Sequence, residues 1–191
     1  MAGGMTITTQ VNTLQTVFNK IKEVHFKKDE LKSADLETEL TIDMELPVLE
    51  DGISFNTGDA DITETKLTTG EKWVTRAMKG DADISLQVAS IAGKINSLFI
   101  EEKKTSISSA SGALIDGVTY QGTAYSLAPK KVTGALVFMS EDRQTIIILP
   151  KVEMYASLVV ADGENPAYFN VKVTPIKNSE GFDLLVLEKT A

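Results

Sequence analysis

The chain has 191 residues, with 27 Asp and Glu against 19 Lys and Arg, one His and no Cys. The lack of Cys excludes disulfides, thiolate metal sites and cysteine nucleophiles, and the net charge of −8 argues against ordinary nucleic-acid binding, which uses Lys and Arg to neutralise phosphates. A length near 190 favours one domain over residues 1–191 with a core of its own. The chain starts neither basic nor apolar, and its apolar runs are far shorter than the roughly 20 residues of a membrane span, so we expect a soluble cytoplasmic product.

The excess negative charge lies in one segment. Residues 29–64 hold twelve acids and one basic residue, Lys32, whereas residues 65–191 are neutral overall. Such a segment is either a solvated surface that keeps the protein soluble or a surface whose charge has a use.

The first candidate element is an amphipathic helix over residues 9–24. Six apolar residues follow helical spacing there: Val11, Leu14, Val17, Phe18, Ile21 and Val24. Frequent Thr and Val also suit an extended arm. We therefore expect an N-terminal arm or helix within about residues 1–30.

A strand is predicted over residues 35–49, where apolar and polar residues alternate. Clean alternation is typical of a sheet with one face on a core and the other in water. The polar row consists mostly of acids: Asp35, Glu37, Glu39, Asp43 and Glu45.

The remaining elements are mostly strands. Turn residues over about 47–70 predict a long loop or hairpin excursion, and a strand over 84–90 leads into a short helix over 91–101. Residues 106–117 are small and polar and predict a loop. Further strands are expected over 118–127, 133–139, 145–149, 152–160, 168–174 and 182–187. This order predicts a mainly β fold, a sandwich or barrel of antiparallel strands with a flanking helix.

A short repeat occurs near the excursion: Gly58-Asp59-Ala60-Asp61-Ile62 recurs as Gly80-Asp81-Ala82-Asp83-Ile84. Its paired carboxylates suggest calcium, but neither copy continues into the ligand spacing of an EF-hand loop. The alternative, which we favour, is a turn that leads into a strand.

The sequence offers little to catalysis. His25 is the only imidazole and lies among apolar and basic neighbours, and no phosphate-binding glycine motif or nucleophile elbow occurs. We therefore expect no enzyme, no catalytic residues, no metal and no cofactor. Two carboxylates could still form a glycosidase pair, although aromatic platforms for sugars are scarce here.

The acidic row points to a different use. Carboxylates on alternate strand residues stand roughly 7 Å apart and repel one another. A surface of this kind offers DNA no gain from counterion release, so DNA would slide past it.

These features together resemble the major tail (tail tube) proteins of long-tailed bacteriophages. The resemblance rests on the strand Leu36 to Val48, the excursion Asp51 to Gly58 continuing into Lys66 to Gly70, the strand Ile84 to Ser90 running into a helix, and a β-rich C-terminal half. It implies a β-sandwich or barrel that assembles into hexameric rings, stacked into a hollow tube for DNA.

The resemblance also implies roles for particular residues. The acids Asp35, Glu37, Glu39, Asp43 and Glu45 would face the lumen. The excursion would be the ring-stacking loop, with the residues Asp51, Phe55, Asn56, Asp59 and Asp61. Partners would be other copies of the chain, tail proteins at the tube ends and DNA in transient passage without specific binding, with no membrane partner; the location would be the virion tail, after synthesis in the host cytoplasm.

Three other functions remain open. The tube subunit of a contractile injection system would share the fold, and a monomeric carbohydrate- or ligand-binding β-sandwich would show an exposed aromatic platform. Candidates for that platform are Trp73, Tyr120, Tyr125 and Tyr155, although we expect each in the core. A glycoside hydrolase ranks last.

Overall fold

Antiparallel strands dominate the structure, a computed structural model that describes residues 18, 20–37, 39–89, 93–160 and 166–189. One curled sheet contains β1 Ile21–Lys27, β2 Met44–Leu46, β3 Val48–Asn56, β6 Asp83–Ala89, β9 Val132–Ser140, β10 Thr145–Val159, β11 Tyr168–Pro175 and β12 Leu185–Glu188. Two separate hairpins pair β4 Ala60–Lys66 with β5 Lys72–Lys79, and β7 Glu101–Ser108 with β8 Gln121–Ser126. The described helices are short: α1 Ser33–Leu36 and α2 Lys94–Phe99. The predicted mainly β fold is confirmed.

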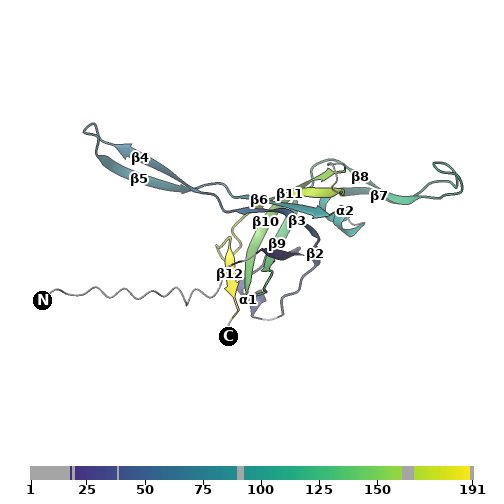
Figure 1. The fold of residues 1–191 in the computed structure, drawn as a ribbon, viewed down its shortest axis with the longest axis horizontal. Coiled ribbons are helices and arrows are strands. Elements are labelled where there is room, and N and C mark those ends of the chain that lie inside the picture. The colour runs from purple at the N-terminus through teal and green to yellow at the C-terminus, as the bar shows by residue number, and fades with distance from the viewer. Residues whose placement is uncertain (1–17, 19, 38, 90–92, 161–165, 190–191) are drawn as a thin grey trace.

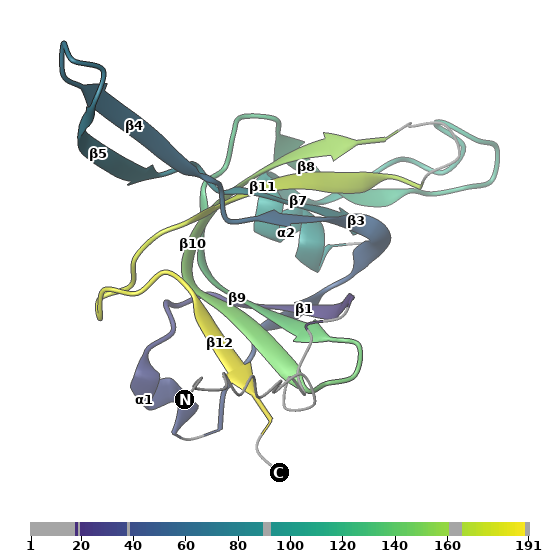
Figure 2. The ribbon, with the colours of Figure 1, turned by 60° about the vertical axis from the view of Figure 1, so that its left-hand side comes forward.

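The sheet bends because β10 changes partners along its length. The strand order of the sheet is β2-β1-β9-β10-β11-β6-β3, and β12 pairs with the start of β10. Residues 145–148 of β10 pair with β12, and residues 152–159 pair with β11, while β9 follows β10 along both parts. The register shift between Leu149 and Val152 falls at Pro150, which lacks the N–H that a regular ladder needs. This bulge lets one strand belong to two layers, as Figure 2 shows.

The main core fills the space inside the curl. Phe26, Phe138 and Phe169 come from strands β1, β9 and β11, and each is at most 1% exposed. α2 adds Ile95 and Phe99, and the Phe99 ring lies 5.3 Å from the Phe169 ring. The helix therefore closes one end of the core, as a flanking helix was expected to do.

A second apolar cluster covers the outer face of β9 and β10. Its buried members are Leu31, Ala135, Val137 and Ile148. The chain between β1 and β2 crosses this face, and buried Asn178 holds it there by donating from Nδ2 to the Leu31 carbonyl oxygen at 3.0 Å. β9 is consequently buried on both faces along most of its length.

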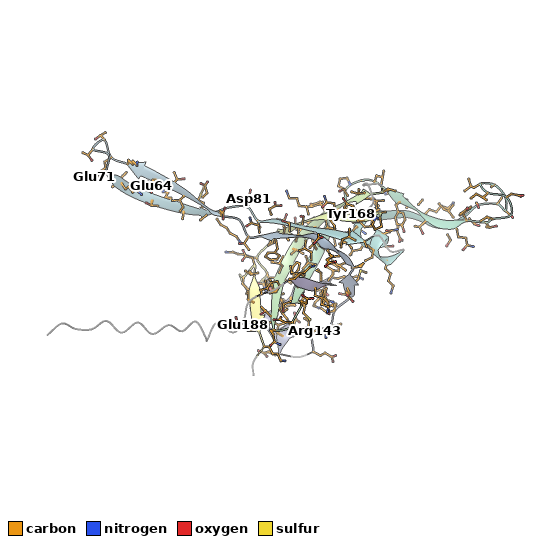
Figure 3. The ribbon with its side chains drawn as sticks, viewed as in Figure 1. Glu64, Glu71, Asp81, Arg143, Tyr168 and Glu188 are labelled. Carbon is orange, nitrogen blue, oxygen red and sulfur yellow. The ribbon has the colours of Figure 1, made fainter. Side chains whose placement is uncertain are left out.

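The two hairpins leave the sheet in opposite directions (Figure 1). We call β4–β5 the first arm and β7–β8 the second arm. Figure 3 shows that the side chains of both arms stand away from the body, with Glu64 and Glu71 far out on the first arm. The predicted excursion over 47–70 thus divides into β3, which belongs to the sheet, and the beginning of the first arm.

The strand predicted over residues 35–49 is wrong for residues 35–37 and 39–43, and residue 38 lies outside the described residues. α1 ends at Leu36 and β2 starts only at Met44. The apolar residues Leu36, Leu40 and Ile42 do pack on the outer apolar cluster, but Leu36 does so from α1, and Leu40 and Ile42 do so from irregular chain. The alternation of apolar and polar residues therefore reflects contact with the face of the sheet and does not indicate pairing with another strand.

Both helix predictions need correction. Residues 9–17 and 19 lie outside the described residues, but Ile21 and Val24 belong to β1, so a helix through residue 24 is wrong. The helix expected over 91–101 ends at Phe99, and residues 91 and 92 lie outside the described part. The chain then turns directly into β7, which also replaces the start of the loop expected over 106–117.

Candidate functional site

The first arm presents large apolar side chains to solvent. Ile62, Trp73 and Met78 are 60%, 68% and 63% exposed. Cross-strand pairing places Asp61 opposite Met78 and Ile62 opposite Ala77, so Ile62 and Met78 lie on opposite faces of the ribbon. Both faces of this arm are thus wet in the single chain.

The two copies of the sequence repeat meet at the base of the first arm. The Gly80 N–H donates to the Asp59 carbonyl oxygen at 2.9 Å. A Cβ on Gly80 would lie 2.1 Å from that oxygen, and a Cβ on Gly58, whose φ is +83°, would lie 2.4 Å from the Asp81 carbonyl oxygen. Each copy leads into a strand, β4 or β6, as expected, but residues 57–59 and 80–82 form irregular junctions in place of the expected turns. The glycines allow the two backbones to cross in contact.

An ion pair also fixes this base to the C-terminal region. Lys79 Nζ lies 2.9 Å from Asp183 Oδ2. The hydrogen bond from Lys79 holds the pKa of Asp183 below the ordinary value, although burial opposes the shift. The arm therefore leaves the body in a defined direction.

The second arm ends in an ordered apolar loop. The Ser109 N–H donates to the Tyr120 carbonyl oxygen at 2.8 Å, and the Val118 N–H donates to the Ile115 carbonyl oxygen at 3.1 Å. Leu114 and Ile115 are 74% and 56% exposed. We call residues 109–120 the tip; it contains one charged residue, Asp116.

The five acids proposed for a lumen do not form a ladder. Asp35 Oδ2 accepts the Lys32 N–H at the start of α1, and Asp43 Oδ2 accepts the Lys28 N–H, both at 2.8 Å. Glu37 and Glu39 lie in the irregular segment, and Glu45 pairs across the ladder with His25. Glu37, Glu39, Asp43 and Glu45 are exposed, but strand geometry does not space them.

The five residues proposed for ring stacking separate into two groups. Asp51, Asn56, Asp59 and Asp61 are exposed on β3, at the base of the first arm and on β4. Asn56 Oδ1 accepts the Gly58 N–H at 2.9 Å, which shapes the turn into the arm. Phe55 packs against the core, and its ring meets Phe138 edge to face at 5.3 Å. Phe55 is therefore better placed to hold β3 than to contact a neighbour.

A cavity of about 780 Å³ opens between β1, β2, α2 and the start of β9. Its apolar lining comes from Phe26, Met44, Leu98 and Val132. Around them stand one acid, Asp43, and four lysines: Lys28, Lys94, Lys130 and Lys131. We call this cavity the socket.

The predicted aromatic positions are wrong in three cases. Trp73, Tyr120 and Tyr155 are 68%, 41% and 44% exposed, where we expected core residues. Tyr125 is partly exposed on β8. The rings lie on different elements: Trp73 on the first arm, Tyr120 at the tip of the second, and Tyr155 on β10.

Other chemistry finds little support in the described part of the chain. His25 Nε2 lies 3.3 Å from Oε2 of Glu23, two residues earlier on β1, and this pair contains no nucleophile. No group of three or more His, Asp or Glu among the described residues could hold a metal ion. No helix in this part is long and apolar enough to cross a bilayer.

The second arm is the candidate functional element that sequence reasoning missed. Residue 101 was predicted to end a helix, and residues 106–117 were predicted to form a polar loop. The exposed pair Leu114 and Ile115, next to one acid in an otherwise uncharged stretch, was the signal available.

Comparison of the sequence with protein-family models and with curated proteins finds no match.

Proposed function

We propose that this chain is a structural virion protein, the subunit of a bacteriophage tail tube. Copies assemble into rings, of six subunits by the resemblance above, and the rings stack into a hollow tube through which DNA passes. The observation that carries the proposal is the pair of arms with exposed apolar side chains that extend from opposite sides of a curled β body (Figure 1).

Exposed ribbons of this kind are costly for a monomer. An isolated two-stranded ribbon is marginally stable in water, because too little apolar surface is buried to offset ordering the chain. Apolar groups on both faces of the first arm and at the tip of the second also invite association. Contact with other copies removes both costs, and a head-to-tail contact repeats to give a ring or a filament.

The first arm supplies the stacking contact in this proposal. It follows the excursion proposed for stacking, its base is fixed by the crossing of Gly58 and Gly80, and Ile62, Trp73 and Met78 are free to pack on the next ring. A fixed base helps, because an arm held in its bound direction loses less conformational entropy on assembly.

The exposed acids Glu37, Glu39 and Glu45 supply the surface past which DNA moves. Glu37 and Glu39 lie on irregular backbone and Glu45 on β2, so the regular spacing of the original argument is lost, but all three acids keep their charge and exposure. Like charge gives DNA no counterion-release gain at such a surface. Tail proteins at the tube ends would be the remaining partners.

Two alternatives share parts of this evidence. A tube subunit of a contractile injection system would need the same arms, and only its genetic neighbourhood separates the two. A monomeric glycan-binding module gains from the exposure of Trp73, and it predicts glycan binding that Trp73→Ala abolishes.

Electron microscopy of the purified protein, before and after concentration, tests the proposal. We expect rings or hollow tubes of uniform diameter, and sedimentation coefficients that rise with concentration. Strictly monomeric protein under all conditions would contradict the proposal. Glycan binding by that monomer would favour the alternative module.

A further inference from the structure

We propose that the tip of the second arm docks in the socket of a neighbouring copy of this chain. The inference rests on the proposed self-assembly and adds a specific subunit contact to it. The first arm, which the proposed function uses for stacking, takes no part in this contact.

The tip has the form of a knob. Leu114 and Ile115 are its most exposed apolar side chains, and Val118 and Tyr120 are 39% and 41% exposed beside them. Backbone hydrogen bonds across the loop hold the tip in a defined shape. Gly112 and Gly117 adopt the positive φ angles that this shape requires. A loop ordered before binding pays less entropy when it binds.

The socket has the complementary form. Its lining is apolar at Phe26, Met44, Leu98 and Val132, and about 780 Å³ of space accommodates more than one large side chain. Phe26 and Val132 are themselves buried, so the lining is part of the rigid core. Burying Leu114 and Ile115 there would remove their apolar surface from water and so stabilise the contact, as buried anchor residues do in other interfaces.

The charges around the socket and on the tip are complementary. Four lysines and one acid surround the socket, whereas Asp116 is the only charged residue of the tip. Lys130 Nζ already donates to the Ser97 carbonyl oxygen at 2.5 Å, and Lys131 pairs with Glu153. Lys28 and Lys94 have no ion-pair partner among the described residues, so their ammonium groups are available to the Asp116 carboxylate.

The first arm is a poorer occupant. Its end, residues 66–72, carries Lys66, Lys72 and Glu71, a net charge of +1 against −1 for the tip, so it has a poorer charge match to the lysines of the socket. Like charges brought together at an interface oppose binding. The knob and the socket are different surfaces of one chain, so the contact is head to tail and can repeat around a ring or along a filament.

Introduced cysteines test this contact cleanly because the chain contains no Cys. Ile115→Cys and Thr133→Cys variants are mixed at a concentration that gives assembly and are then oxidised mildly. Thr133 is exposed and lines the socket. A disulfide needs Cβ atoms about 3.5–4.5 Å apart, so a cross-linked dimer would report a close contact.

We expect the Ile115→Cys and Thr133→Cys pair to cross-link at least about tenfold more than a matched pair of Ile62→Cys and Thr133→Cys, in which the free apolar residue lies on the first arm. Asp116→Lys on the tip should reduce cross-linking, and Lys94→Glu in the partner variant should restore part of it. Equal cross-linking of the two pairs, or no cross-linking in assembled protein, would overturn the inference and leave the socket to another ligand.

The same samples, viewed by electron microscopy, separate this inference from the proposed function. Tubes without the cross-link would overturn the knob-and-socket contact and leave the tube proposal standing. Cross-linked chains that form no rings or tubes would support the contact and contradict the tube proposal.

Discussion

Gly134 occupies a site in β9 with no room for a side chain. A Cβ there would lie 2.2 Å from the Lys27 carbonyl oxygen and 2.5 Å from the Phe26 ring. The absence of a side chain lets β1 and β9 approach closely over the core. This close approach is a property of the backbone pairing, and the residues before and after Gly134 do not predict it.

Gly134→Ala should lower the free energy of unfolding by about 1–3 kcal/mol, the usual cost of overpacking a core. Gly122→Ala is the matched control, because a Cβ on Gly122 meets nothing within 4 Å. We expect the control to change stability by less than about 0.5 kcal/mol. Urea denaturation of both variants measures the difference, and equal effects would contradict the packing described for β1 and β9.

Glu23 and Arg143 form an ion pair between the start of β1 and the turn from β9 to β10. Arg143 Nη2 donates to Glu23 Oε1 at 2.7 Å. This hydrogen bond holds the pKa of Glu23 below its ordinary value; burial opposes the shift, and His25 adds a smaller lowering. Figure 3 shows Arg143 at the end of the molecule opposite the arms.

Arg143→Gln should raise the pKa of Glu23 toward its ordinary value, as measured by NMR titration. Because the folded pKa is lowered, the pair stabilises the protein at pH values above the ordinary Glu pKa of about 4.5. That stabilisation is lost as the pH falls through the lowered pKa. Arg143 is 67% exposed, so the difference in urea midpoint between the two proteins is small at pH 7. A difference that grows as the pH falls would contradict this assignment.

At the level of elements, strands whose patterns matched their burial were predictable. β6 alternates between buried and half-buried residues, and β9 is a nearly continuous apolar run, so both were found within one or two residues. β10 was predicted as two strands because Pro150 interrupts the pattern. Long-range pairing makes it one strand, since β9 follows it past the bulge.

Residues 35–43 show where the pattern misleads. Alternation indicates that one side of a segment contacts an apolar surface, and Leu40 and Ile42 do pack on one. Alternation does not say whether a neighbouring strand has a free edge to pair with. The outer face of β9 and β10 offers contact without an edge, so this segment covers the sheet as irregular chain.

Replacing Glu37, Glu39 and Glu45 together by Lys should leave the urea midpoint nearly unchanged, because all three side chains are exposed. Tubes of this variant should retain a short DNA duplex in co-sedimentation, since the new lysines displace counterions from phosphates. Asp43 is kept, because its carboxylate accepts the Lys28 N–H.

The matched control for this variant replaces three exposed acids outside both arms, Asp29, Glu141 and Glu188, by Lys. It changes the net charge equally. DNA retention that is no greater in the first variant than in the control would show that residues 37–45 do not face the DNA path.

At the scale of the whole molecule, the body and the arms differ in how many of their apolar side chains are buried. The body buries most of its apolar side chains within one chain, although Val160 and Val186 are 69% and 50% exposed, so its composition and pattern predicted its class. The arms bury few side chains and leave Trp73, Met78 and Leu114 more than 60% exposed. Aromatic residues were expected in the core, and the expectation failed for Trp73 and Tyr120 on the arms and for Tyr155 on β10.

Trp73 reports directly on whether copies of this chain bury the arms, because it is the only Trp in the protein. Its emission, measured with the sedimentation coefficient as concentration rises, should shift to shorter wavelength as rings or tubes form, since the exposed indole enters an apolar contact. Ile62→Asp with Met78→Asp, which removes apolar surface from the same arm, should abolish both changes. Tubes in which Trp73 keeps the emission of an exposed indole, or protein that stays monomeric at every concentration, would contradict the account.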